Sequence, residues 1–91
     1  MTRQDLIERI GQATEGEHPR KLVAEVVDTT FARIADALRD DGRFSYPGFG
    51  TFTVRDRAAR TGKNPRSGEP IEIPASRAVT FRPARALKDA L

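Results

Sequence analysis

The stretch RTGKNPRSGEPIEIPASR, residues 60–77, decides how this chain must be organised. It is rich in glycine, proline and basic residues and has only two large aliphatic side chains, Ile71 and Ile73. Such a segment cannot pack a hydrophobic core, and long loops without structure are uncommon in compact domains and tend to be functional. We therefore expect it to form a limb that projects from the rest of the chain.

The composition limits the classes of function that the chain can serve. With 91 residues it forms one domain at most, and a partner subunit would help a chain of this size to bury enough surface. There is no cysteine and His18 is the only histidine, which excludes Cys-based zinc sites and argues against other metal centres. No segment has the roughly 20 apolar residues of a membrane span or the apolar core of a signal peptide. We expect a soluble intracellular protein without cofactor, metal, membrane or small-molecule substrate.

The charge is unevenly distributed along the chain. Residues 1–53 carry seven basic and nine acidic side chains, a net charge of −2, whereas residues 54–91 carry nine basic and four acidic ones, a net charge of +5. Attraction to an array of phosphates depends on clustered charge more than on the total, so this asymmetry points to nucleic acid or another anionic surface.

Two helices are predicted in the first half of the chain. Thr2 and Asp5 resemble a capping box, and apolar residues at helical spacing predict a first helix over residues 3–14. Pro19 suits the first turn of a second helix, which Gly42 terminates.

The second helix carries a wide apolar stripe. Its members recur every three or four residues: Leu22, Val23, Val26, Val27, Thr30, Phe31, Ile34, Ala35 and Leu38. Such a stripe is most often the core of a single chain, but one short helix and a small sheet are too little to cover it. We interpret it as a core shared between two subunits.

After Gly42 the apolar period changes to two, which is typical of strands. Two short strands are predicted around a tight turn at YPGFG, residues 46–50, with the second strand running on toward Arg60. A third strand follows the limb at residues 78–81, and Pro83 is expected to begin a last helix. The predicted order, two helices, two strands, the limb, a strand and a helix, defines an α+β fold.

The limb and the strand before it have the features of a DNA-binding ribbon. Arg55 and Arg57 lie on one face of the second strand, with Asp56 on the other, because side chains alternate along a strand. At the predicted tip, Lys63 and Arg66 flank the pair Asn64-Pro65, whose proline is rigid. Basic side chains can neutralise phosphates while a proline ring enters the base stack. The alternative is that Asn64-Pro65 and Ser67-Gly68 are simply turn-forming pairs of a surface loop.

Functions of other classes have less support. A binder of single-stranded nucleic acid needs aromatic side chains on its basic surface, and the limb has none. A hydrolase needs a nucleophile beside a base, and no such arrangement is evident, so we expect no catalytic residues and no enzyme. An acidic protein partner in place of DNA remains open.

The sequence resembles the HU/IHF family of bacterial DNA-bending proteins, and HU most of all, over essentially its whole length. The resemblance rests on GFGTF (48–52), VRDRAAR (54–60), GKNPRSGE (62–69), IEIPAS (71–76) and FRPARALKDAL (81–91). Taken together, these motifs are far more specific than any one of them.

The resemblance implies an architecture. Members of this family are intertwined dimers with a helical base, a three-stranded sheet and two protruding β-ribbon arms. By this resemblance, residues 1–42 form a helical dimerisation part, 43–59 and 75–82 a saddle-shaped sheet with the arm bases, 60–74 the DNA-binding arm tip, and 83–91 a C-terminal helix. The implied dimer core consists of Val27, Phe31, Ile34, Leu38, Phe49, Phe52 and Phe81.

The resemblance also implies the residues that bind DNA. Pro65 matches the proline that intercalates from the arm tip. The remaining contacts are implied for Arg55, Arg57, Arg60, Lys63, Asn64, Arg66, Arg77, Arg82, Arg85 and Lys88.

The implied function is that of a non-enzymatic, homodimeric protein of the cytoplasmic nucleoid. It would bind double-stranded DNA largely without sequence specificity and bend it through the arms. Two alternatives stay open: a subunit of an IHF-like heterodimer that prefers particular sites through DNA deformability, and a protein that coats DNA without bending it.

Overall fold

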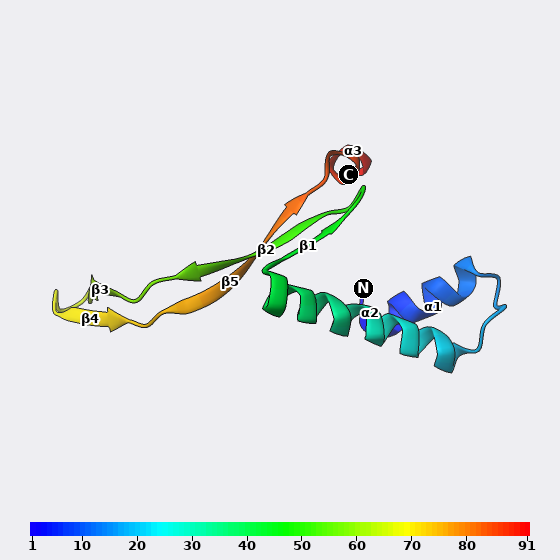
Figure 1. Cartoon of the computed structure of the whole chain (residues 1–91), viewed down its shortest axis with the longest axis horizontal. Helices are drawn as coiled ribbons and strands as arrows, with labels where there is room; N and C mark the ends of the chain where they lie inside the picture. The colour runs from blue at the N-terminus through cyan, green and yellow to red at the C-terminus, as the bar shows by residue number, and fades with distance from the viewer. The chain divides into compact units, whose positions relative to one another are not determined.

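The computed structural model describes residues 1–91, which form two compact units, Met1–Asp36 and Ala37–Leu91. The predicted α+β fold is confirmed (Figure 1). No helix is long and apolar enough to cross a membrane. In chain order the elements are α1 (Arg3–Ala13), α2 (Arg20–Asp41), β1 (Arg43–Tyr46), β2 (Gly50–Arg57), β3 (Arg60–Lys63), β4 (Pro70–Ile73), β5 (Ser76–Pro83) and α3 (Arg85–Ala90).

Helix α1 begins at the predicted capping box. The Thr2 hydroxyl accepts a hydrogen bond from the Asp5 amide at 3.3 Å, and the Thr2 amide donates to the Asp5 carboxylate at 2.9 Å. Both bonds satisfy amides that have no partner within the helix. The core of the first unit is small, because only three side chains are buried in it: Ile7, Val23 and Val27.

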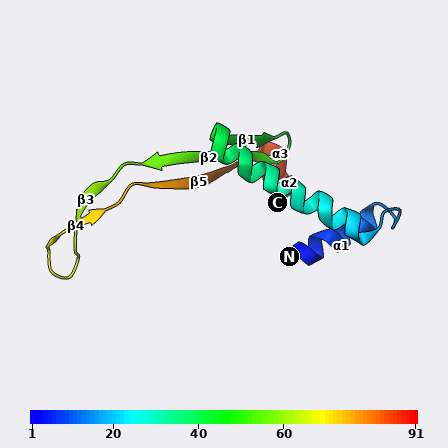
Figure 2. The ribbon, with the colours of Figure 1, turned by 60° about the horizontal axis from the view of Figure 1, so that its bottom comes forward.

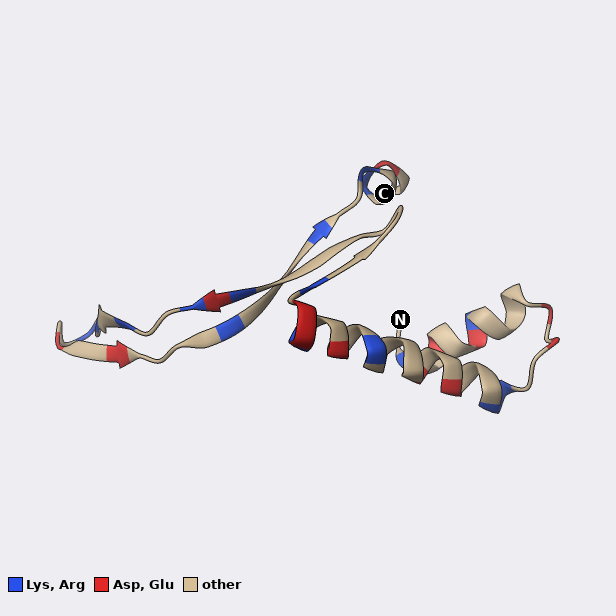
Figure 3. Ribbon diagram, viewed as in Figure 1, with Lys and Arg blue, Asp and Glu red and all other residues tan.

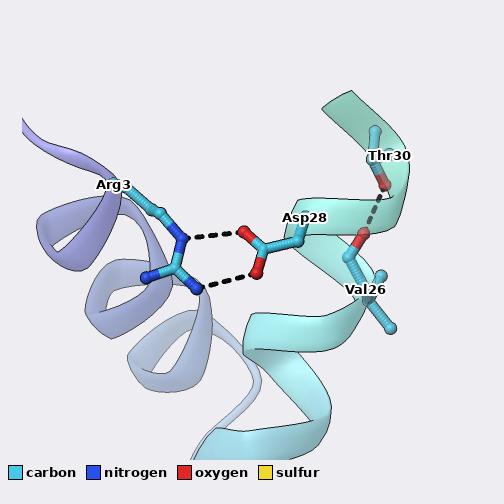
Figure 4. Close-up of polar contacts among 4 residues, drawn as sticks. All are labelled: Arg3, Val26, Asp28 and Thr30. Atoms are coloured by element: carbon cyan, nitrogen blue, oxygen red, sulfur yellow. Dashed lines mark hydrogen bonds and ion pairs between the residues drawn. The ribbon is translucent and has the colours of Figure 1, made fainter. Parts of the chain in front are cut away.

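A polar clasp joins α1 to the first part of α2 (Figure 4). The Arg3 Nε donates to Asp28 Oδ1 at 2.7 Å and the Arg3 Nη2 donates to Oδ2 at 2.8 Å, a bidentate pair. On the same helix, the Thr30 hydroxyl donates to the Val26 carbonyl at 2.7 Å, which explains how a polar residue fits into the apolar stripe.

Replacing Asp28 with asparagine should make the stability of the protein less sensitive to acid. The hydrogen bond from Arg3, helped by its charge, lowers the pKa of Asp28. A carboxyl with a lowered folded-state pKa stabilises the fold above its unfolded pKa of about 3.9, and this contribution is lost as the pH falls through the folded-state value. The melting temperatures of the parent and the variant should therefore differ at pH 7 and converge toward pH 2.

The difference at pH 7 should be small, because both side chains of the pair are about half exposed. Glu25→Gln makes the same charge change on α2 at an exposed residue without an ion pair and serves as the control. A gap between parent and Asp28→Asn that stays constant down to pH 2 would show that the pair does not stabilise the fold.

The second unit is built on an antiparallel sheet of order β1-β2-β5. The predicted turn joins its first two strands: the Phe49 amide donates to the Tyr46 carbonyl at 3.1 Å, with Pro47 and Gly48 between them. Gly48 has a φ of 79°, which matches the third position of a type II turn and favours glycine there. Strands β2 and β5 pair from Gly50 opposite Pro83 to Arg57 opposite Ser76.

The predicted limb contains a two-stranded sheet of its own, β3-β4. The ladder of β2 and β5 stops at Arg57, and that of β3 and β4 begins where Arg60 pairs with Ile73. The predicted long second strand is therefore interrupted at residues 58–59, opposite residues 74–75. Figures 1 and 2 both show β2 and β5 running side by side toward β3 and β4, and we call residues 58–75 the arm.

The last helix begins later than predicted. Pro83 is the final residue of β5, where its missing amide hydrogen is tolerated, and it does not start the helix. The next amide, of Ala84, donates to the Phe49 carbonyl at 2.9 Å, so the chain stays tied to the sheet before α3 begins at Arg85.

Candidate nucleic-acid interface

The two faces of the three-stranded sheet have different chemistry. Phe52 pairs in register with both Phe44 and Phe81, so these aromatic residues share one face. The Phe52 and Phe81 rings are tilted with centroids 4.6 Å apart, and the Phe49 ring lies 5.4 Å from that of Phe81. This apolar face is the side of the sheet suited to packing.

The opposite face of the sheet, which we call the polar face, carries arginine and hydroxyl side chains. Register places the following residues on it: Arg43, Ser45, Thr51, Thr53, Arg55, Arg57, Ser76, Ala78, Thr80 and Arg82. None of them is acidic. An open groove of about 530 Å³ is lined by six of these residues, Arg43, Thr51, Thr53, Arg55, Thr80 and Arg82, and also by Phe81, whose register places it on the apolar face.

The polar face is well suited to phosphate oxygens. Arginine offers a planar fork of donors that matches phosphate geometry, and hydroxyl groups add further donors between the charges. The Ser45 and Thr51 hydroxyls already lie 3.0 Å apart in a hydrogen bond, and the Thr80 hydroxyl donates to the Thr53 carbonyl at 3.3 Å.

Arg77 lies on β5, on the face of the β2-β5 pair opposite the polar face. It pairs in register with Asp56, and its Nε donates to Asp56 Oδ1 at 2.9 Å. The sequence predicted that Asp56 points away from Arg55 and Arg57, and the register agrees. Alternation along β5 therefore places Arg77 away from the polar face, and Asp56 pairs with it there without placing a negative charge among the other arginines.

The arm also has two distinct faces. Arg60 pairs with Ile73 and Gly62 with Ile71, which places these four residues on one face. A Cβ on Gly62 would lie 3.0 Å from the Cδ1 of Ile73, so the isoleucine side chain covers the glycine. Lys63 belongs to the other face with Pro70, so the two basic residues of β3 lie on opposite sides of the arm.

The arm tip is a closed loop of defined geometry. The Asn64 amide donates to the Glu69 carbonyl and the Gly68 amide donates to the Asn64 carbonyl, both at 2.8 Å. Gly68 has a φ of 72°, which a residue with a side chain rarely adopts. Pro65 and Arg66 are exposed within this loop.

The other basic residues predicted to bind DNA lie at the end of the sheet and beyond it. Arg82 belongs to the polar face, whereas Arg85 and Lys88 are exposed on α3. Arg85 lies 3.8 Å from Asp89 one turn later, a weak exposed pair that leaves its guanidinium free to meet another anion. Figure 3 shows Lys and Arg along β2 and β5, in the arm and at the start of α3, with a few acidic positions among them.

The residues predicted to form a dimer core fall into three groups. Val27 is already buried within the chain, against α1. Three others are half-buried: Ile34, Leu38 and Phe52. Phe31, Phe49 and Phe81 remain 59%, 45% and 41% exposed, a large exposure for phenylalanine.

Sequence reasoning missed part of the polar face. Arg43 was not predicted as a site residue, nor were Thr51, Thr53 and Thr80. The signal was present, because Arg43 precedes an alternating apolar and polar pattern that places it on the same face as Ser45. It could be read only once the register of β1 against β2 was known.

A profile of the family described as "Bacterial DNA-binding protein" matches residues 1–91, the whole chain. The chain belongs to the HU/IHF family. The resemblance identified from the sequence motifs is thus confirmed, and this family consists of DNA-binding proteins, not enzymes.

Relatives and solved structures agree with membership of the HU/IHF family. The chain is 44% identical over 91 residues to "DNA-binding protein HU 1" of Bacillus subtilis, covering 100% of this chain and 97% of that protein. It is 42% identical to "Integration host factor subunit alpha" of Anaeromyxobacter, covering 79% of it. The structure is similar to Anabaena HU in a cocrystal with DNA, with a TM-score of 0.81, 27% identity, and coverage of 99% of this chain and 96% of that one. An HU variant from Thermotoga maritima has a TM-score of 0.68 at 26% identity, with coverage of 99% and 97%.

Proposed function

We propose that this chain binds double-stranded DNA as a protein of the bacterial nucleoid, in the cytoplasm. The observation that carries the proposal is the polar face: four arginines and five hydroxyl residues without an acidic side chain, on the sheet whose strands β2 and β5 lead into the arm. The DNA-binding names of its HU relatives and the DNA in the Anabaena cocrystal support the same ligand.

Binding is largely independent of sequence. Arginine and hydroxyl contacts to phosphates fix the position of a protein on the duplex but read no bases. The arm adds contacts in the minor groove, whose pattern of donors and acceptors is degenerate. Arg77 joins these contacts only by exchanging Asp56 for a phosphate.

The arm bends DNA by inserting Pro65. Pro65 is the exposed apolar group of a loop that also contains Arg66, at the far end of a basic ribbon. Insertion of an apolar wedge into the minor groove is the established mechanism of architectural proteins, the HU/IHF family among them. Lys63, Arg66 and Arg60 then contact the adjacent phosphates.

The functional unit is a dimer of identical chains. A 91-residue chain with three buried side chains has little core of its own, whereas Leu22, Val26 and Phe31 of α2 are exposed. Exposed apolar surface of this extent is typical of protein interfaces. A dimer also supplies two arms, and with them two copies of Pro65.

Replacing Pro65 with alanine should reduce DNA bending without abolishing binding. Removing the ring leaves the phosphate contacts in place but removes the wedge between base pairs. We would measure end-to-end fluorescence transfer on a short duplex labelled at both ends, titrated to saturation at fixed salt. Transfer should rise on binding of the parent and rise much less on binding of Pro65→Ala, while the two affinities stay within about tenfold, or ~1.4 kcal/mol.

Pro70→Ala is the matched control, since Pro70 lies on the same arm but outside the tip loop. It should bend DNA like the parent. A parent that saturates the duplex without raising transfer would instead be a protein that coats DNA, and the bending part of the proposal would be wrong.

A further inference from the structure

We propose that Asn64 is a positioning residue that holds Pro65 in the orientation required for insertion, and that it does not act mainly as a DNA contact. The inference rests on the proposed insertion of Pro65. It gives Asn64 a role different from the one that its place among the basic tip residues implied.

The hydrogen bonds of Asn64 are already used within the tip. Its backbone amide and carbonyl bond to Glu69 and Gly68, closing the loop. Its side-chain Oδ1 accepts a hydrogen bond from the Arg66 amide at 2.9 Å. Three of its four hydrogen-bonding groups are therefore committed to the loop, and only the Nδ2 amide group remains for an outside partner.

The bond from Asn64 to Arg66 spans Pro65. An asparagine that accepts from the amide two residues later forms an Asx turn, and proline suits the central position because its φ is already fixed. The residue before a proline is itself restricted to extended conformations. Few torsions in this three-residue segment remain free, so the proline ring is held in one direction relative to the arm.

Burial agrees with this division of roles. Asn64 is half-buried in the loop, whereas Pro65 and Arg66 are exposed. A proline wedge that is already held in place before it meets DNA binds with a more favourable free energy, because no further entropy is lost in ordering it. Asn64 thus acts through Pro65, and its loss should affect bending more than it affects charge neutralisation.

The test compares four variants by fluorescence transfer at saturation, salt dependence of affinity, and hydrogen exchange of the Arg66 amide. Asn64→Ala removes the acceptor, and Asn64→Ser keeps a side-chain oxygen that can form the same turn, though more weakly, while losing the carboxamide. Ser67→Ala is the matched control, because it removes another tip hydrogen bond, from the Glu69 amide at 3.3 Å, that does not span Pro65. Pro65→Ala defines the transfer expected without a wedge.

We expect Asn64→Ala to fall to the transfer level of Pro65→Ala with an unchanged salt slope, and its Arg66 amide to exchange about tenfold faster than in the parent. Asn64→Ser should recover most of the bending, and Ser67→Ala should bend like the parent. The proposal is overturned if Asn64→Ser is as defective as Asn64→Ala, which would mean a direct carboxamide contact, or if Asn64→Ala bends normally. Normal bending by Pro65→Ala would contradict the insertion of Pro65, and with it the role of Asn64. Reduced bending by Pro65→Ala together with normal bending by Asn64→Ala would contradict the role of Asn64 alone.

Discussion

Replacing Gly50 with alanine should destabilise the protein by about 2 to 6 kcal/mol, because overpacking and backbone strain each cost about 1 to 3 kcal/mol. A Cβ at this position would lie 2.6 Å from the Arg82 carbonyl oxygen and 2.6 Å from the ring of Phe81. The ring could rotate away, but the carbonyl belongs to β5 and can move only with the strand. The φ of Gly50 is 158°, which residues with a side chain rarely adopt.

Thermal unfolding followed by circular dichroism gives the measurement, at matched protein concentration because the proposed dimer would melt at a concentration-dependent temperature. At about 4 to 8 °C per kcal/mol for a chain of this size, the melting temperature should fall by about 10 °C or more. Gly11→Ala is the control of opposite sign. Gly11 lies in α1 with nothing within 4 Å of its would-be Cβ, so alanine there should be neutral or stabilising by up to about 1 kcal/mol. Equal melting temperatures for Gly50→Ala and the parent would mean that β2 and β5 are not held at this spacing.

The prediction also has a functional side. Gly50 opposes Pro83 at the end of the ladder where β2 begins, and Thr51 opposes Arg82 next to it. A shift of β5 would therefore displace Arg82 from the polar face. Loss of DNA affinity in Gly50→Ala should exceed what its unfolded fraction explains.

Local chemistry made much of this fold predictable. The capping box at Thr2 and the tight turn at Pro47 and Gly48 depend on neighbouring residues, and each occurs where the sequence indicated. Pro19, which was expected in the first turn of α2, lies directly before that helix. The start of α3 was wrong by two residues. Proline is equally suited to the first turn of a helix and to the end of a strand. Here the Ala84 amide donates to the carbonyl of Phe49, a residue distant in sequence, and this bond keeps Pro83 in the strand.

The site was predictable to a lesser degree, because it depends on register. Period-two alternation placed Arg55 and Arg57 together and Asp56 opposite, but it could not show that Asp56 meets Arg77 across the ladder. Nor could it bring Arg43 to the same face as Thr53 and Thr80, which lie on different strands. For Asn64, the sequence suggested a DNA contact, and only the bond to the Arg66 amide points to a positioning role.

Replacing both Arg55 and Arg57 with alanine should weaken DNA binding by about 100-fold or more at low salt, because a hydrogen bond to a charged group contributes about 1.5 to 3 kcal/mol and 1.4 kcal/mol is tenfold in affinity. Both side chains are exposed on the polar face, next to the arm. Asp56 lies between them in sequence but on the other face, so it does not offset their charge there.

The salt dependence of this loss distinguishes phosphate contacts from a general effect of charge. Each phosphate that a protein neutralises adds about −0.9 to the slope of log affinity against log salt concentration, so losing two contacts per chain should flatten the slope by about 1.8 for each bound chain. Fluorescence anisotropy with a short duplex at several salt concentrations measures the slope. The control replaces Arg9 and Arg33, which belong to α1 and α2 and not to the polar face, and removes the same charge.

The comparison of the two double variants decides where DNA lies. If phosphates lie along β2, as the acid-free face favours, replacing Arg55 and Arg57 should flatten the salt slope of the affinity. Replacing Arg9 and Arg33 should leave that slope unchanged, although both double variants lose the same formal charge. If both pairs flatten the slope equally, DNA is attracted by the total charge of the protein, and the polar face is not its binding surface. Arg77→Ala then adds a third case: a change in slope on removing it would mean that phosphate displaces Asp56 and that the opposite face of the ribbon also meets DNA.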